Sequence, residues 1–277
     1  MIRTFKKCGA WALSLITLIF AFVPEKCFNK SVLFINVSEE VIIVLNRFCV
    51  FVIVFVLTAV VYALWLKFRP NTTIKGHNYS IRVEYGDLFE MHNCKKVIQF
   101  DECFITHMGD APADIKPNSV CGQFLQKHPL QDTQMQQLIN NAQVKPAKGK
   151  SKYQNRTRYE SGKLVPYYDG DDHYLLLAFA KLSEIGNGEI TRDEYLECLS
   201  LLWKEIDRHY GQKDVYITVL GAGITRLGDE SLTQQKLLDI MIESYKLSSH
   251  KIKFPCQLHI VCKRTAGFSI NKIGESI

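Results

Sequence analysis

The chain has 277 residues and a formal net charge of +6, which is enough length for one sizeable domain and a smaller appendage. Hydrophobic residues make up 47% of the chain and are densest before residue 67, while the remainder has the mixed polarity of a soluble domain. The modest charge and the lack of helix-turn-helix, RNA-recognition or zinc-finger signatures argue against nucleic-acid binding. Nine scattered cysteines without a CxxC pair fit reduced thiols, so we expect neither disulfides nor a metal site.

The strongest feature near the N-terminus is an uncharged apolar segment, residues 48–66, which lies between Arg47 and Lys67. It is long enough to cross a hydrocarbon core of about 30 Å, so we predict a transmembrane helix. Arg69 and Lys75 follow it, and basic residues of this kind mark the cytoplasmic side. The alternative is a core helix of a soluble domain, which an unbroken apolar stretch of this length disfavours.

A second apolar segment covers residues 10–23 and follows three basic residues. We predict a retained helix, with a signal peptide as the alternative, because Val23 and Pro24 make a poor cleavage site. Basic residues before the first helix and after the second predict a two-pass membrane hairpin in residues 1–69, with a short outer loop between the helices. Both chain termini and the following domain would then be cytoplasmic.

The rest of the chain is expected to form one domain. Residues 70–79 contain Pro70 and Gly76 and little to bury, so they are predicted as a linker. Residues 80–264 alternate strand-like and helix-like patterns, which predicts a three-layer α/β domain with a mixed sheet. Residues 265–277 are expected to be a loosely held tail. The predicted strands are 80–85, 95–100, 174–182, 214–220 and 256–262; the predicted helices are 129–142, one that begins with a capping box of Thr191 and Glu194, and one capped by Ser231 with Gln234.

A basic stretch at residues 144–158 separates two of these elements. It could attract anionic lipid or a nucleotide. The alternative is a solvated loop, which the lack of an accompanying aromatic pattern favours.

Three predicted strands end in residues suited to ligand binding, since open α/β sheets bind ligands beyond the carboxyl ends of their strands. These are residues 86–88, residues 101–102, and the segment GAGITR at residues 221–226. Small residues in GAGITR would let backbone N–H groups approach an oxyanion, and Thr225 and Arg226 would add a hydroxyl and a positive charge. A tight strand-to-helix turn would use the same glycines, so both interpretations stay open. No nucleophile, base and orienting group come together in sequence, so no catalytic residue is predicted.

The ordered motifs GDLF, KKVIQFDECFIT, SVCGQFLQ, YLLLAFAKL, TRDEYLECLSLLWKEID and VYITVLGAGITRLG resemble the macro-like domains of bacterial anti-phage systems. With the apolar segments in front, the chain is similar over nearly its full length to the transmembrane-macro effectors of type II Thoeris defence. Macro domains bind ADP-ribose derivatives, so the resemblance implies that Asp87, with Leu88 beside it, contacts the adenine amino group. The diphosphate would lie between GAGITR and the stretch Cys121, Gly122, Gln123 and Phe124.

Two departures from hydrolytic macro domains favour a sensor over an enzyme. The glycine run is missing near residues 121–124, and the catalytic Asn-Ala-Asn segment is replaced by Gln99–Phe100–Asp101–Glu102. In such systems a TIR-domain partner makes a histidine–ADP-ribose conjugate from NAD, and Asp101 and Glu102 could meet its histidine end. The predicted ligand-binding residues are Asp87, Leu88, Phe100, Asp101, Glu102, Gly122, Gln123, Phe124, Gly221, Ala222, Gly223, Ile224, Thr225 and Arg226.

The resemblance therefore implies an effector in the bacterial inner membrane, without a resident cofactor, that oligomerises on binding this messenger. Membrane disruption and cell death or growth arrest would follow. Two alternatives stay open: a membrane-tethered ADP-ribosyl hydrolase, and a membrane scaffold that binds no nucleotide.

Overall fold

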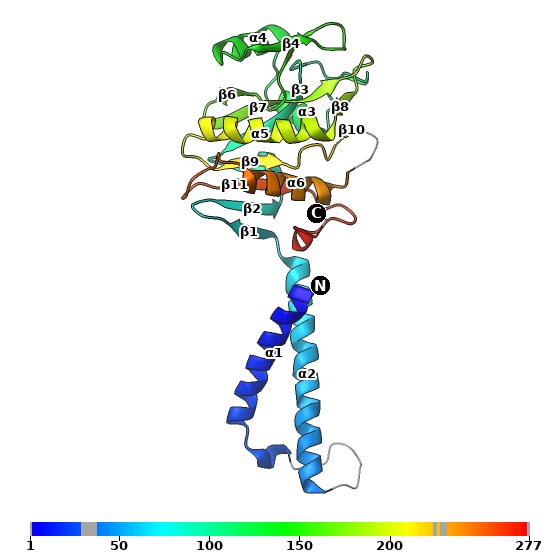
Figure 1. Ribbon diagram of the computed structural model, residues 1–277, viewed down its shortest axis with the longest axis vertical. Coiled ribbons are helices and arrows are strands. Elements are labelled where there is room, and N and C mark those ends of the chain that lie inside the picture. The colour runs from blue at the N-terminus through cyan, green and yellow to red at the C-terminus, as the bar shows by residue number, and fades with distance from the viewer. Residues whose placement is uncertain (1, 29–37, 224–225, 228–231, 276–277) are drawn as a thin grey trace. The chain divides into compact units, whose positions relative to one another are not determined.

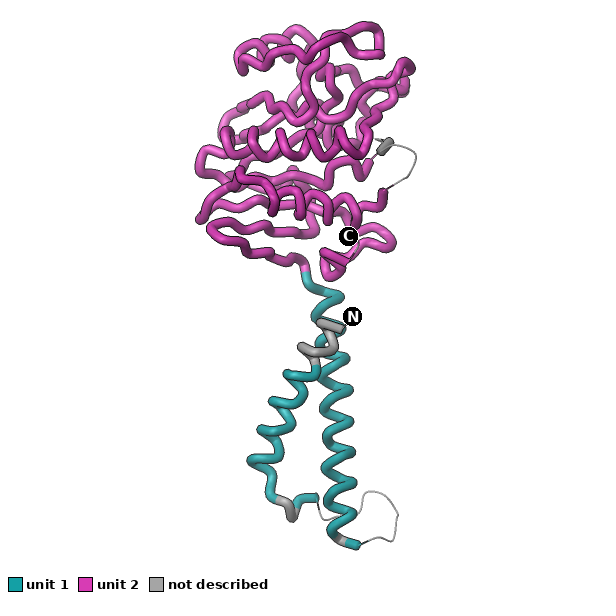
Figure 2. Tube along the Cα trace, viewed as in Figure 1, with its two compact units in different colours: residues 1–69 teal, residues 70–277 magenta. Residues whose placement is uncertain are grey.

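The computed structural model describes residues 2–28, 38–223, 226–227 and 232–275. Of the predicted residues, Ile224, Thr225 and Ser231 lie outside the described part of the chain, as does the side chain of Arg226. The chain divides into two compact units, residues 1–69 and 70–277, which are coloured separately in Figure 2.

The first unit consists of two helices, α1 (Ile2–Phe22) and α2 (Glu39–Phe68), and the short 3-10 helix η1 (Glu25–Phe28). Among the described residues, α2 is the one helix long and apolar enough to cross a membrane, and its most apolar window contains no buried residue. The core helix of a soluble domain is mostly buried, and α2 in this chain is not. The apolar part of α1, Gly9–Phe22, is shorter than a bilayer span, so the predicted two-helix membrane hairpin is not established.

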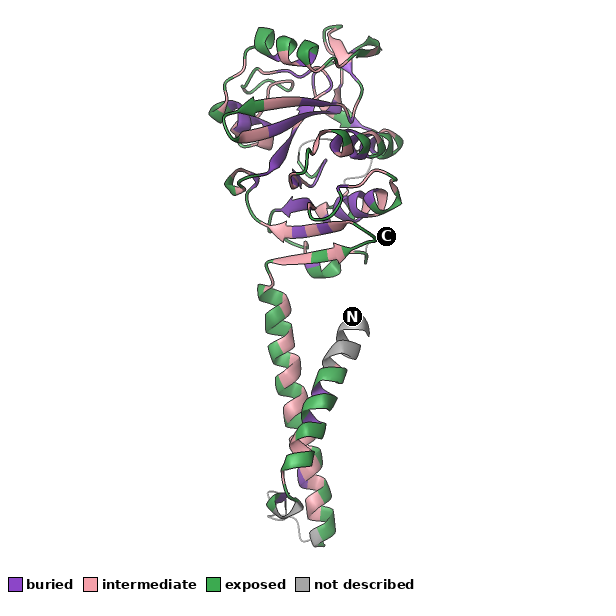
Figure 3. Cartoon of the chain, turned by 90° about the vertical axis from the view of Figure 1, so that its left-hand side faces the viewer, coloured by how far each residue is buried: buried purple, intermediate pink, exposed green. Residues whose placement is uncertain are grey.

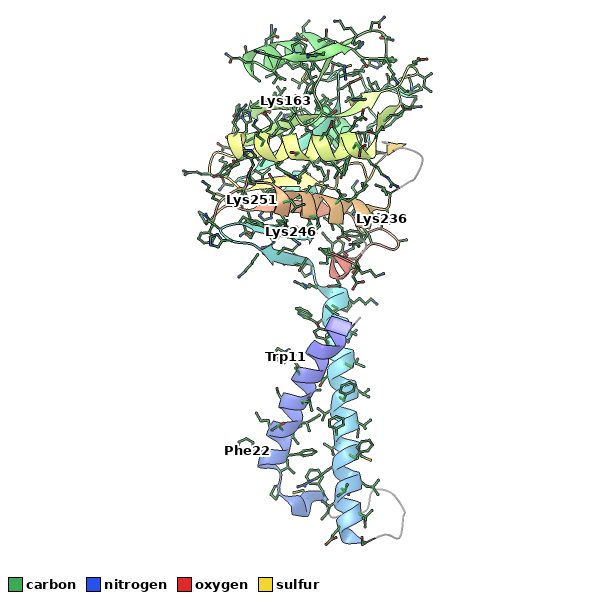
Figure 4. All side chains as sticks on the ribbon, in the orientation of Figure 1. Trp11, Phe22, Lys163, Lys236, Lys246 and Lys251 are labelled. Atoms are coloured by element: carbon green, nitrogen blue, oxygen red, sulfur yellow. The ribbon has the colours of Figure 1, made fainter. Side chains whose placement is uncertain are left out.

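Side chains of α1, η1 and α2 hold the first unit together. Asn46 is buried, and its Nδ2 donates a hydrogen bond to the carbonyl of Phe28 at 2.7 Å. The guanidinium of Arg47 lies 5.7 Å from the ring centroid of Phe20 and 5.5 Å from that of Phe28. By contrast, Trp11 and Phe22 are strongly exposed on α1, as Figure 4 shows.

The second unit is built on a mixed sheet, whose strands are ordered β1-β2-β11-β9-β3-β7-β8-β10 in the described residues, with β6 also paired to β7. Strands β2, β11, β9, β3 and β7 are parallel to their neighbours in that order, whereas β1, β6 and β8 are antiparallel to theirs. The predicted mixed sheet is thus confirmed. The strands are β1 Asn71–Lys75, β2 Ser80–Tyr85, β3 Lys95–Asp101, β6 Leu164–Asp169, β7 Asp172–Leu182, β8 Gly188–Ile190, β9 Val215–Thr218, β10 Arg226–Leu227 and β11 Leu258–Cys262.

Helices cover both faces of this sheet. On one face α5 (Arg192–His209) and α6 (Gln234–Leu247) bury a large apolar core that includes Trp203 and Tyr245. On the other face α3 (Val120–Lys127) and α4 (Asp132–Asn141) pack over a second core around Phe124. Figure 1 shows α5 and α6 side by side in front of the strands, and Figure 3 shows the buried residues concentrated in the sheet and on the inner helix faces.

One of the two predicted helix caps is confirmed. The Thr191 hydroxyl accepts a hydrogen bond from the N–H of Glu194, and the Glu194 carboxylate accepts one from the N–H of Thr191, which is the predicted capping box of α5. The predicted cap of α6 is wrong, since Thr233 caps this helix and its hydroxyl accepts from the N–H of Lys236. The side chain of Gln234 is bonded to the C-terminal segment, since its Nε2 donates to the carbonyl of Lys263 and its Oε1 accepts from the Thr265 hydroxyl.

Three segments expected to be irregular are ordered. The predicted linker contains strand β1, whose Ile74 packs against the core, because pairing with β2 satisfies its backbone groups. The predicted tail includes η3 (Ile270–Lys272), where Ile270 is buried and the N–H of Gly274 donates to Asp239. The basic stretch forms a two-stranded hairpin of β4 (Pro146–Lys150) and β5 (Thr157–Tyr159) rather than a loop.

Candidate functional site

The strand order creates a switch point between β9 and β3. In the sheet, β3 has β7 as its other neighbour, and β9 has β11 as its other neighbour. The chain therefore continues from β3 and from β9 in opposite directions across the sheet. The two strands pair only at Lys95–Lys96 with Val215–Tyr216, and further along the Nε2 of Gln99 donates to Thr218 Oγ1 at 2.7 Å. Ligands of open α/β sheets bind outside the carboxyl ends of the strands at such a point. The loops that follow β2, β11, β9 and β3 are therefore the candidate site.

Asp87 lies at the carboxyl end of β2 and is exposed. Its Oδ1 accepts a hydrogen bond from the N–H of Phe89 at 2.9 Å and so caps the 3-10 helix η2 (Leu88–Glu90). This cap holds the Asp87 carboxylate in place at the end of β2. The side chain of Leu88 is buried, which fixes this turn to the domain.

Hydrogen bonds to α5 and α6 fix the backbone at the start of the loop after β9. The hydroxyl of Tyr195 in α5 donates to the carbonyl of Leu220 at 3.2 Å, and the N–H of Leu220 donates to Met241 Sδ in α6 at 3.3 Å. Gly221 has a φ of +76°, a conformation that favours glycine, and it turns the chain outward. Ala222 and Gly223 are exposed beyond it, and a Cβ added to Gly223 would meet no atom within 4 Å.

The carboxyl end of β3 carries two acidic residues with different surroundings. Asp101 is half-buried and accepts hydrogen bonds from the N–H groups of Cys103 at 2.7 Å and Ile105 at 3.1 Å. Burial raises the pKa of Asp101 to about 7, although these two N–H groups oppose the rise. Glu102 is buried, and it accepts from Ser151 Oγ at 2.7 Å and from the N–H of Leu182 at 3.2 Å. The Glu102 side chain is thus occupied within the protein, contrary to the predicted ligand contact.

The stretch expected as the first phosphate loop forms the start of α3. A Cβ on Gly122 would lie 2.2 Å from the carbonyl oxygen of Lys116, so packing alone requires glycine there. Phe124 is buried with Phe100, their ring centroids 6.1 Å apart, so both predicted contacts belong to the core rather than to an exposed site. Gln123 is half-exposed, and its Nε2 donates a hydrogen bond to the carbonyl of Asn118 at 3.2 Å.

Sequence reasoning missed a basic pair at the carboxyl end of β11. Cys262 is paired with Tyr85, so Lys263 and Arg264, both exposed, come next to Gly86–Asp87. The guanidinium of Arg264 lies 4.1 Å from the centroid of the Tyr85 ring. The sequence does show two basic residues directly after an apolar strand. They belong to the candidate site only because β11 lies between β2 and β9 in the sheet, which the sequence does not show.

The raised pKa of Asp101 predicts a pH dependence of stability. Between its ordinary value of 3.8 and about 7, the folded chain holds this proton while the unfolded chain has lost it. The contribution of Asp101 to the free energy of unfolding therefore falls as pH rises through this window and is constant above it. We expect the free energy of unfolding of the wild type, minus that of Asp101→Asn, to fall between pH 4 and pH 7. Denaturant titration at each pH measures it, and a constant or rising difference would contradict the assignment.

No group of three or more His, Cys, Asp or Glu side chains that could hold a metal ion occurs among the residues that the structure describes. The donor set of the candidate site is instead backbone N–H groups, one exposed carboxylate and basic side chains. Backbone N–H groups and basic side chains of this kind attract anions.

The helix-covered mixed sheet and the loops at its switch point define an α/β domain of the ligand-binding macro class. The family model described as Thoeris protein ThsA, Macro domain, matches residues 81–263, which is more than half of the chain. The chain therefore belongs to the ThsA macro-domain family of Thoeris anti-phage defence, and the resemblance seen in its motifs is confirmed.

The chain is also similar to several individual proteins. The Thoeris protein ThsA of Bacillus amyloliquefaciens (strain Y2) is 29% identical over 285 residues, which cover 97% of this chain and 88% of the relative. Among solved structures, a point mutant of the Oceanobacillus iheyensis macrodomain aligns with 74% of this chain and 93% of its own, at 9% identity and a TM-score of 0.46. The macrodomain of Thermus aquaticus DarG aligns with 67% of this chain and 98% of its own, at 14% identity and a TM-score of 0.40.

Proposed function

We propose that this chain is a membrane-anchored Thoeris effector whose macro domain binds an ADP-ribose derivative as a signal. The observation that carries the proposal is the set of groups at neighbouring strand ends. Asp87 follows β2, Arg264 follows β11 and Gly221–Gly223 follow β9, and these three strands are adjacent in the sheet. In the histidine–ADP-ribose conjugate, the adenine would meet Asp87, and the diphosphate would meet Arg264 and residues 221–223.

Each group has a chemical role in this proposal. The free oxygen of Asp87 accepts a hydrogen bond from the adenine amino group, and Arg264 adds a positive charge between adenine and diphosphate. The backbone N–H groups of residues 221–223 approach the diphosphate closely, because Gly223 leaves open space where a side chain would stand. Neighbouring parallel strands are about 4.8 Å apart, so the groups lie on the scale of a dinucleotide.

Asp87→Asn is expected to weaken binding of histidine–ADP-ribose roughly 10- to 100-fold, because a hydrogen bond to a charged group contributes about 1.5–3 kcal/mol. The asparagine oxygen still accepts from the N–H of Phe89, so η2 keeps its cap and the fold is unaffected. Isothermal titration calorimetry on the full chain in detergent measures the affinity. Unchanged affinity with an unchanged melting temperature would remove Asp87 from the site.

Two features of β3 support a sensor over a hydrolase. The Asp101 carboxylate already accepts two backbone N–H groups, and Glu102 is buried against Ser151 and Leu182. Both carboxylates therefore have structural partners within the protein, which favours a binding role. An assay for release of ADP-ribose from a modified protein tests the alternative. Release by the wild type that is lost in Asp101→Ala would favour the membrane-tethered hydrolase.

The exposed apolar surface of α2 supports a membrane anchor. Its large apolar side chains point outward along the whole helix, among them Phe48, Val56, Leu64 and Trp65. A soluble protein does not expose an apolar surface of this extent. With α1 packed against α2 through Ala12 and Ile16, the pair would form a two-pass hairpin in the bacterial inner membrane, both termini in the cytoplasm. The proposal includes a TIR-domain enzyme as the source of the signal and oligomerisation of the effector as the response.

The domain offers a direct connection between the site and the membrane helix. The N–H of Tyr85, two residues before Asp87, donates to the carbonyl of Pro70 at 3.1 Å. Only Arg69 separates Pro70 from the last residue of α2. From Asn71 to Lys75 β1 is paired in register with β2, so this part of the predicted linker is a strand. A shift of the Asp87 loop on ligand binding would therefore reach the end of α2 through Tyr85 and Pro70.

A further inference from the structure

The hairpin of β4 and β5 is a positively charged surface of the domain. Residues 145–158, which we call the basic hairpin, contain six basic residues and no acidic one. The two strands pair with each other in a separate sheet, so an ordered backbone carries these charges. Within the described residues, Arg158 alone of the six forms an ion pair, with Glu102. The exposed basic residues of the hairpin are Lys145, Lys148, Lys150 and Lys152.

A surface of opposite charge lies at residues 184–197, which we call the acidic surface. It contains five acidic residues and one basic residue. Strand β8 pairs with the end of β7, and Lys181 of β7 contacts the carboxylate of Glu194 in α5, so β8 and the start of α5 lie together. Ile185 and Leu196, within this surface, are 66% and 50% exposed. Its acidic residues that are exposed and form no ion pair within the described part of the chain are Glu184, Glu189, Asp193 and Glu197.

One buried carboxylate connects both surfaces to the end of β3. Ser151 Oγ of the basic hairpin donates to Glu102 Oε1 at 2.7 Å, and the N–H of Leu182, two residues before the acidic surface, donates to the same oxygen at 3.2 Å. No ion pair between the described residues joins the two surfaces, and β4 and β8 lie apart in Figure 1. Each surface therefore presents unpaired charge to another molecule. Because Glu102 follows Asp101 directly, both surfaces also adjoin the candidate site.

The signs of these charges decide which contact between two copies of the chain is favourable. A symmetric contact of either surface with its own equivalent would place like charges opposite each other, which costs free energy. Contact of the basic hairpin of one copy with the acidic surface of the next places opposite charges together. Such a contact would also cover Ile185 and Leu196 within a charged rim, which is the usual anatomy of an interface.

A contact between two different surfaces does not stop at two copies. Each copy that uses its basic hairpin still has an acidic surface for a further copy, so the assembly continues into a ring or a filament. In the proposed effector, the membrane anchor would hold every copy with the same side toward the lipid. Rotation about the membrane normal, which relates the copies of a ring, preserves that orientation.

We infer that copies of this chain assemble head to tail, with the basic hairpin of each copy bound to the acidic surface of its neighbour. The inference rests on the proposed function, which includes oligomerisation as the response, and adds the two surfaces that meet and the symmetry of the assembly. Because Glu102 connects both surfaces to the end of β3, a change at the candidate site would alter their relative positions.

Two charge-reversed proteins test this contact. The hairpin variant carries Lys148→Glu and Lys152→Glu, and the acidic-surface variant carries Glu184→Lys and Glu197→Lys. All four side chains are exposed, so both variants should fold. Light scattering of the full chain in detergent with histidine–ADP-ribose measures the size of the assembly, and calorimetry on the same samples measures ligand binding.

We expect the wild type to form assemblies larger than a dimer. Each variant alone should assemble at least roughly 10-fold more weakly, since every reversal replaces an attraction by a repulsion. An equimolar mixture of the two variants should assemble again, because the reversed hairpin fits the reversed acidic surface and the two native surfaces still fit each other. A control protein with Lys236→Glu and Lys246→Glu on α6 (Figure 4) has the same net charge as the hairpin variant and should assemble within about twofold of the wild type.

The results that would overturn the inference are distinguishable from a failure of the proposed function. Wild type that binds the ligand but remains a single chain or stops at a dimer removes the inference alone. Wild-type assembly in either variant, or a mixture that fails to assemble, places the contact elsewhere on the molecule. Wild type that neither binds the ligand nor assembles removes the proposed function and the inference together. Loss and rescue as expected, but with no ligand bound, would remove the receptor function and leave the head-to-tail contact standing.

Discussion

Gly223→Glu is expected to abolish binding of ADP-ribose derivatives, with the dissociation constant raised at least 100-fold. A Cβ at Gly223 meets no atom within 4 Å, so the substitution leaves the fold intact. The new carboxylate would stand among the N–H groups proposed to hold the diphosphate. Two like unit charges about 4 Å apart near a protein surface repel by roughly 4 kcal/mol, which exceeds the roughly 2.7 kcal/mol that 100-fold requires. Calorimetry together with thermal unfolding of the full chain measures both effects.

Two variants at the same position separate bulk from charge. Gly223→Ala adds one methyl group into open space and is expected to change affinity less than about threefold, since no neighbour has to move. Gly223→Gln adds a side chain of the same size as glutamate without its charge and is expected to lie between the two. Wild-type affinity in a folded Gly223→Glu protein would mean that the loop after β9 is a tight turn only.

Insertion of Gly-Ser-Gly between Arg69 and Pro70 is expected to separate ligand binding from the membrane response. The insertion leaves the Tyr85–Pro70 hydrogen bond and the β1–β2 pairing in place, so affinity should stay within threefold. It adds about 10 Å of flexible chain before α2, which would absorb a displacement of the domain. Ligand-dependent leakage from vesicles containing the effector, and growth arrest in cells that supply the ligand, should fall more than 10-fold.

A matched insertion tests whether added chain alone is harmful. The same tripeptide after Gly170 lengthens the turn between β6 and β7, where Gly170 is exposed and away from β1. Both ligand binding and leakage should persist in this control. Full leakage in the protein with the insertion before Pro70 would show that the signal does not pass through β1.

The sequence alone predicted those elements whose stabilising contacts join residues close together in the chain. The Thr191 and Glu194 capping box is such a signal, since both hydrogen bonds lie inside one turn of chain. Strand β1 is the opposite case. Its sequence, Asn-Thr-Thr-Ile-Lys, is too polar to indicate a strand, and it is ordered because β2 pairs with it at the sheet edge. The C-terminal segment was missed for the same reason, since Ile270 finds its apolar contacts only in the folded domain.

The residues of the candidate site also differ in how far the sequence alone could identify them. Asp87 and Gly221–Gly223 could be selected from the sequence because they follow predicted strands, where open α/β sheets bind ligands. Glu102 could not be placed, because its partners Ser151 and Leu182 are 49 and 80 residues away in the chain and bury a side chain that sequence alone suggests is exposed. Arg264 gains its place only from β11 lying next to β2, a pairing that joins residues far apart in sequence.

Titration of histidine–ADP-ribose into the purified full chain is the most direct measurement of whether this macro domain is a receptor. We predict saturable binding of one ligand per chain, lost in Gly223→Glu and retained in Gly223→Ala. The absence of any binding heat at high micromolar ligand, with protein that unfolds cooperatively and is therefore intact, would contradict the account.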